Sequence, residues 1–118
     1  MTVFESLLVA HLIMDWLFQT DWQATHKHAS WRAALAHCAV YAFGFVPVFL
    51  FYHISWWWFL ILFASHVVLD HWPISEFVLR FVKHARKDRV PENLWLILNI
   101  TIDQVLHIAV LALIASLY

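Results

Sequence analysis

The chain has 118 residues, of which 64% are hydrophobic and 13% are charged, and its net charge is −1. Soluble domains average about 45–50% apolar and about 25% charged residues, and a small domain buries too little surface to hide such an excess. The composition therefore excludes an ordinary soluble fold, Cys38 alone cannot form an internal disulfide, and no basic patch or glycine-rich loop supports nucleic acid or nucleotide binding.

Four hydrophobic runs approach or exceed the length of about 17–25 residues that a membrane-spanning helix needs. They cover residues 3–20, 31–52, 56–72 and 93–118. We expect Gly44 and Pro47 to bend the second run, since proline removes a helical hydrogen bond. The predicted fold is all-α, an integral membrane four-helix bundle in which residues 1–118 form one domain.

The segment between the third and fourth runs, residues 73–87, predicts a different helix. Its apolar residues recur every three or four positions, and charged residues occupy the other face. We expect this amphipathic helix to lie at the membrane interface, although a cap packed on the bundle would show the same stripe. The apolar stripe consists of Ile74, Phe77, Val78, Phe81 and Val82.

The basic residues predict the orientation of the bundle. All seven Lys and Arg residues follow either the first run or the third run. Positive charge marks the cytoplasmic side of a membrane protein. We therefore expect both termini to be periplasmic, in a bacterial inner membrane. The basic residues are Lys27, Arg32, Arg80, Lys83, Arg86, Lys87 and Arg89.

Three of the runs contain a histidine and an aspartate four residues apart, a spacing that puts both on one helix face. The order is His–Asp in the first and third runs and Asp–His in the fourth. Because the fourth run crosses the membrane in the opposite direction, the aspartates fall in one layer and the histidines in a second, about 6 Å deeper. The pairs are His11–Asp15, His66–Asp70 and Asp103–His107.

These groups predict a metal site. An acid at a helix centre costs about 2.5–3.5 kcal/mol to insert, so the acids must face one another, water or a cation. Imidazole and carboxylate bind zinc, manganese and iron, and we expect zinc first. Two divalent ions with a bridging hydroxide would balance the negative charge of three carboxylates. The alternative is a single ion, with the aspartates orienting the histidine ligands by hydrogen bonds. The candidate ligands are His11, Asp15, His37, His66, Asp70, Asp103 and His107, and the candidate residues that orient them are Gln19, Asn99 and Gln104.

Three motifs resemble those of a family of small bacterial inner-membrane proteins known only as a domain of unknown function. They are AHLIMDWLFQTDW (10–22), SHVVLD (65–70) and DQVLH (103–107). The resemblance covers essentially the whole chain and implies a multi-helix membrane protein without assigning an activity. The pattern is also similar, more loosely, to membrane-bound metal-dependent hydrolases, which implies only metal ligation at the seven positions.

We expect a metal-dependent hydrolase that acts, among membrane lipids, on a lipid-linked or membrane-soluble substrate. Asp15 or Asp70, which lie nearest the cytoplasmic mouth, would accept the proton of the attacking water. One alternative is a cation or proton transporter or its accessory subunit, which would need a homo-oligomer because four short helices enclose little volume. Another is a non-catalytic membrane adaptor whose polar face binds a partner helix.

Overall fold

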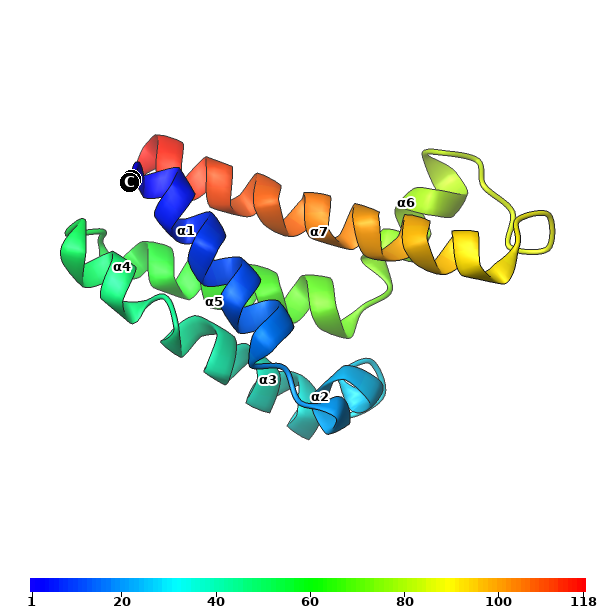
Figure 1. Cartoon of the computed structure of the whole chain (residues 1–118), viewed down its shortest axis with the longest axis horizontal. Coiled ribbons are helices and arrows are strands. Elements are labelled where there is room, and N and C mark those ends of the chain that lie inside the picture. Colours follow the sequence, from blue (N-terminus) through cyan, green and yellow to red (C-terminus); the bar gives the residue numbers. More distant parts are fainter.

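The computed structural model describes residues 1–118 and consists of helices joined by short connections, so the all-α prediction is confirmed. Figure 1 shows long helices running beside one another, with both termini at one end of the molecule and the α6–α7 connection at the other. The helices are α1 (Val3–Leu12), α2 (Asp21–His26), α3 (Trp31–Phe43), α4 (Val46–Phe51), α5 (Trp56–His71), α6 (Ile74–Phe81) and α7 (Glu92–Leu117).

The order of packing brings distant parts of the sequence together. Helix α3 packs on α5, α5 packs on α7, and α7 packs on α1, which also contacts α4. Hydroxyl side chains fix where the helices begin. In α1, Thr2 and Glu5 form a reciprocal capping box, and Ser30 and Ser55 accept backbone hydrogen bonds at the starts of α3 and α5. These caps set the register of the helices that carry the polar side chains.

The first helix changes geometry in its last turns. After Leu12 the chain winds as a π-helix, η1 (Ile13–Leu17), and helical structure stops before Phe18. A π-turn is wider than an α-turn, so residues within it are rotated away from the face that α-helical spacing predicts. Asp15 lies inside this turn, and its carboxylate pairs with His37 of α3 and with Gln104 of α7.

The second predicted run is interrupted where its glycine lies. A turn at Gly44 and Phe45 separates α3 from α4, and Pro47 occupies the first turn of α4, where proline is tolerated. Residues Trp31–Phe51 together are long and apolar enough to cross a membrane, and so is α7. The other helices are shorter than this criterion requires.

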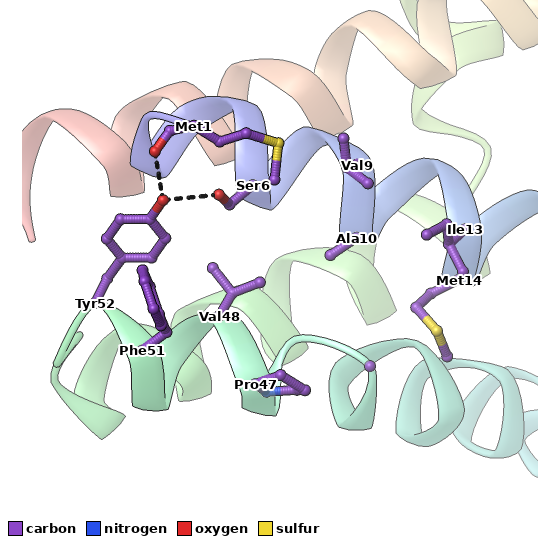
Figure 2. Close-up of a pocket in the computed structure, with 11 residues that line it drawn as sticks. Met1, Ser6, Val9, Ala10, Ile13, Met14, Pro47, Val48, Phe51 and Tyr52 are labelled. Atoms are coloured by element: carbon purple, nitrogen blue, oxygen red, sulfur yellow. Dashed lines mark hydrogen bonds between the residues drawn. The ribbon is translucent and has the colours of Figure 1, made fainter.

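The close approach of α1 to the α3–α4 turn explains the glycine. A Cβ at position 44 would clash with the side chain of Met14. Figure 2 shows the apolar hollow above this contact, a cavity of about 520 Å³ between α1 and α4. At its far end the Tyr52 hydroxyl lies 3.0 Å from Ser6 Oγ and donates to the carbonyl of Met1, which ties the N-terminus to the end of α4.

The predicted amphipathic helix over residues 73–87 is shorter than expected. Helix α6 ends at Phe81, and His84 has a φ of 53°, a left-handed conformation that breaks an α-helix. Leu79 is fully buried in this helix, which packs on α7. The predicted stripe omitted Leu79, and its residues Phe77 and Phe81 are exposed. The exposure of Phe77 and Phe81 is compatible with the predicted interfacial stripe, while Leu79 packs the other face of α6 on the bundle.

The molecule has an inverted distribution of polarity. More large hydrophobic side chains are exposed than buried, while the interior contains four histidines and two aspartates. The apolar part of the core gathers around Leu7, Phe49, Leu62 and Leu111. Exposed apolar residues on every long helix and a polar centre are the reverse of a water-soluble domain.

Candidate metal centre

Four side chains from three helical segments meet in the interior. They come from η1, α3 and α5, and one possible ligand atom of each lies within 4.8 Å of the other three. We call this group the central cluster: Asp15, His37, His66 and Asp70. All four residues are buried, and Asp70 has only 1% of its surface exposed. Helical spacing explains part of this convergence, because His66 and Asp70 lie one turn apart on α5.

The spacing of these atoms fits a single small cation. His37 Nε2 lies 3.1 Å from Asp15 Oδ1 and 2.9 Å from Asp70 Oδ2. His66 Nε2 lies 3.3 Å from Asp70 Oδ2 and 3.8 Å from Asp15 Oδ1, and the two Nε2 atoms are 3.0 Å apart. Bonds of about 2.0–2.1 Å to a tetrahedral zinc ion put neighbouring ligand atoms about 3.3 Å apart. The measured distances bracket that value.

The central cluster also has more acceptor atoms than protons. Each neutral imidazole carries one proton, and both rings aim Nε2 at the two carboxylates and at each other. Their Nδ1 atoms are buried without a hydrogen-bond partner. Unpaired buried polar atoms are rare because each costs about 1–3 kcal/mol. A cation among the four ligand atoms would satisfy the lone pairs that point inward.

A second group shares Asp70 with the central cluster. His107 and Asp103 on α7 approach the other side of this carboxylate, with His107 Nε2 3.3 Å from Asp70 Oδ1. His107 Nδ1 donates to the backbone carbonyl of Asp103 at 2.8 Å, so Nε2 of the neutral ring carries the lone pair. Neither His107 Nε2 nor Asp70 Oδ1 has a hydrogen-bond partner. Asp70 therefore lies between two sets of candidate ligands.

A lysine also reaches the centre. Lys27 follows α2, and its Nζ lies 2.9 Å from Asp70 Oδ2, with 14% of its side chain exposed. Burial disfavours the charged amine, but the charge of Asp70 and its hydrogen bond to Nζ, with smaller effects of Asp15 and Asp103, raise the pKa of Lys27 above its ordinary value. The ammonium is thus a built-in cation beside three carboxylates. Sequence reasoning used Lys27 only as a marker of orientation, and no local pattern identifies it as part of the site.

His11 lies beside the candidate ligands and not among them. Its Nδ1 is 2.9 Å from the Tyr41 hydroxyl and its Nε2 is 2.9 Å from Gln104 Oε1, so both ring nitrogens have partners. Its ring stacks on that of His107, with the centroids 5.5 Å apart. Gln104 pairs with both His11 and Asp15, so the two residues stay close, but it is the Asp15 carboxylate that pairs with His37.

The three amide residues have different surroundings. Gln104 Nε2 donates to Asp15 Oδ2 at 3.0 Å while its Oε1 pairs with His11, so this amide links the two residues. Gln19 Nε2 lies 3.3 Å from His37 Nε2. Asn99 Oδ1 is buried without a hydrogen-bond partner. Gln104 is the amide best placed to orient an aspartate.

Tyr41 is a contributor that the sequence analysis missed. Its ring lies flat on the imidazole of His66, with centroids 3.5 Å apart and planes within 6°. Its hydroxyl pairs with His11. The stacked ring limits rotation of His66 about its side-chain bonds, and so holds Nε2 toward Asp70. The position of Tyr41 one helical turn after His37 was the available signal.

The site has an opening lined by residues of η1, of the segments on either side of α2, and of α7. A cavity of about 200 Å³ borders the central cluster through Asp15 and also exposes Lys27 and Asp103. Asp70 does not line it, in agreement with its burial. The complete lining consists of Asp15, Trp16, Gln19, Lys27, Ile100, Asp103 and Gln104. A small polar molecule can therefore meet Asp15 and Lys27 before it meets the histidines.

Comparison with protein families identifies the chain. The family model described as Protein of unknown function (DUF3307) matches residues 3–118, so the chain belongs to this family. The expected membership of a domain-of-unknown-function family is therefore confirmed. No curated protein and no solved structure matches the chain.

Proposed function

We propose that this DUF3307 chain is an integral membrane protein that binds one divalent cation in the central cluster and uses it to hydrolyse a lipid-linked or membrane-soluble substrate. The observation that carries the proposal is the convergence of two imidazole Nε2 atoms and two carboxylates, whose ligand atoms all lie within 4.8 Å of one another. Histidine and carboxylate ligands suit zinc, and also manganese or iron.

A membrane environment is supported by the inverted polarity of the molecule. In lipid, apolar side chains face outward and ionisable groups face the interior of the bundle, where they mark functional sites. Two segments, Trp31–Phe51 and α7, have the length and hydropathy of membrane-spanning helices. We propose that α1 with η1, and α5, cross the membrane beside them. All Lys and Arg residues belong to the α2–α3 segment or to α6 and the α6–α7 connection, and neither segment lies at the end that carries the termini, which supports periplasmic termini in a bacterial inner membrane.

The charge of the site supports one ion in preference to two. Asp15, Asp70 and Asp103 contribute three negative charges, and the Lys27 ammonium contributes one positive charge. One divalent ion would balance the remainder, whereas two ions with a bridging hydroxide would leave an excess of positive charge in a medium of low dielectric. The sequence-based count favoured two ions because it did not include Lys27.

The access cavity supports catalysis by assigning different roles to the two aspartates. A catalytic zinc site has three protein ligands and an open fourth position. His37, His66 and Asp70 would hold the ion, and Asp15, the member of the central cluster that lines the cavity, would yield the fourth position to water and accept its proton. A bound divalent ion lowers the pKa of water toward about 7 and polarises the bond to be broken. The Lys27 ammonium lies where it would neutralise negative charge that develops on the substrate.

The experiment is a hydrolysis assay on the full chain reconstituted in bacterial lipid, after removal of metal with a chelator. Zinc should restore release of a water-soluble product, and Asp15→Asn should abolish release while it retains the metal. Asp21→Asn, an exposed acid nearby, is the matched control and should behave as the wild type. Release that does not depend on metal, or metal-dependent uptake of the ion into vesicles without any product, would contradict hydrolysis and would favour transport in the second case.

A further inference from the structure

The segment from α6 to the start of α7 combines two exposed features that the metal site does not use. The first is a pair of aromatic rings: Phe77 and Phe81 are 57% and 64% exposed, and their ring centroids lie 4.6 Å apart. Val82, which follows them, is 65% exposed. Buried Leu79 anchors the other face of the helix on α7. The apolar group therefore projects from a held helix and not from a free end.

The second feature is a concentration of positive charge. Residues 76–89 contain five basic and two acidic residues, a net charge of +3 in a chain whose net charge is −1. Glu76 pairs with Arg80 at 2.6 Å, and Asp88 pairs with Arg86 at 3.1 Å. The three remaining cations have no carboxylate within ion-pair distance. They are Lys83, Lys87 and Arg89.

The chain holds these charges next to the aromatic pair. The left-handed conformation of His84 turns the backbone directly after α6, and Arg89 closes a second turn by donating from its amide to the carbonyl of Arg86 at 3.0 Å. Between the turns lies a polar hollow of about 430 Å³, lined by Arg80, Ala85, Arg86, Lys87 and Asp88. Figure 1 shows this connection at the end of the molecule opposite the termini, beside the first turns of α7.

We propose that residues 77–89 form a binding surface for anionic phospholipid, with Phe77, Phe81 and Val82 inserted among the acyl chains and the three unpaired cations on the phosphate groups. Apolar residues beside Lys and Arg on one short helix are the features of a segment that lies in the headgroup layer. Charge complementarity selects anionic over zwitterionic headgroups. The surface lies apart from the central cluster and does not depend on the bound metal.

The test uses the full chain with a fluorophore attached to Val82→Cys. Cys38, the one native cysteine, is replaced by alanine, so that the new thiol is the only one in the chain. The protein in neutral-detergent micelles is titrated with phosphatidylglycerol, and in parallel with phosphatidylcholine and with inorganic phosphate. We expect a blue shift of the fluorophore with phosphatidylglycerol only. The Lys83→Gln/Lys87→Gln/Arg89→Gln variant should need at least about ten times more of this lipid, since each charge at the surface contributes roughly a fivefold factor.

Arg32→Gln removes an exposed cation elsewhere and is the matched control, which should titrate as the wild type. Phe77→Ser/Phe81→Ser should reduce the blue shift while it preserves the dependence on anionic lipid. An equal response to phosphatidylcholine, an equal response to phosphate alone, or a triple variant that titrates as the wild type would each overturn the proposal. Circular dichroism of each variant establishes that its helices are intact.

Discussion

Lys27 Nζ and Asp70 Oδ2 lie 2.9 Å apart, and both side chains are largely withdrawn from solvent. The amine is therefore the cation that balances the most buried acid of the site in the metal-free protein. Lys27→Met would leave Asp70 buried without that charge, and loss of one partner of a buried pair costs about 3–5 kcal/mol. We expect a lower Tm after chelation and a larger recovery on adding zinc than in the wild type, because ligand binding stabilises the folded state.

The control for Lys27 is Lys87→Met, which changes the same side chain at an exposed position. Its Tm should follow the wild type with and without zinc. A metal-free Lys27→Met protein as stable as the wild type would show that the ion pair does not balance Asp70.

His66 and His11 should respond differently to the same substitution. His66→Asn removes an Nε2 of the central cluster and should eliminate metal binding. His11→Asn should retain the metal but lose about 1–3 kcal/mol of stability, because Tyr41 and Gln104 each lose a buried hydrogen-bond partner. Metal content and thermal unfolding of both variants measure this contrast. Equal loss of metal in the two variants would put His11 among the ligands.

Tyr41 should affect metal affinity through its ring and not through its hydroxyl. Tyr41→Phe keeps the ring stacked on His66, so zinc affinity should stay close to that of the wild type. Tyr41→Leu removes the flat surface, and groups that orient a ligand typically account for a factor of about 10–100 in metal affinity. Competition with a chromogenic chelator gives both affinities. A larger loss in the Phe variant than in the Leu variant would contradict the role of stacking.

Gly44→Ala tests the contact between α1 and the α3–α4 turn. The added Cβ would clash with Met14, and overpacking of this kind costs about 1–3 kcal/mol. Met14→Ala removes the obstructing side chain, so the double variant Gly44→Ala/Met14→Ala should be more stable than the additive sum of the two single variants. Thermal unfolding of all four proteins completes the cycle. Strict additivity would mean that the two positions do not touch.

Much of the site could be predicted because helical periodicity is regular. The order of Asp103 and His107, reversed relative to His66 and Asp70, predicted antiparallel helices with their polar residues at the same depth. In the structure these four residues belong to two groups of candidate ligands that share Asp70. The predicted separation into an aspartate layer and a histidine layer does not extend to the ligand atoms. His66 Nε2 lies 3.3 Å from Asp70 Oδ2, because side chains one turn apart reach toward each other.

The residues that the sequence misplaced depend on features that hydrophobic periodicity does not report. His11 was predicted as a ligand because it lies one turn from Asp15, but Tyr41 and Gln104 occupy both of its ring nitrogens, and no hydrophobic pattern predicts that pairing. Helix α6 ends at Phe81, and His84 has a left-handed backbone, whereas the apolar stripe predicted a helix that continues to residue 87. Lys27 joins the site through the fold of the α2–α3 connection, and periodicity carries no information about such a connection.

The metal content of the full chain, purified in detergent after exposure to zinc, manganese and iron, is the most direct test of the metal site. Elemental analysis should find one divalent ion per wild-type chain and none in Asp70→Asn, while Asp88→Asn, an exposed acid, should retain it. Circular dichroism should show the same helical content in all three proteins. A folded wild-type chain without metal, or an Asp70→Asn chain with unchanged metal content, would contradict the assignment of the central cluster as a metal centre.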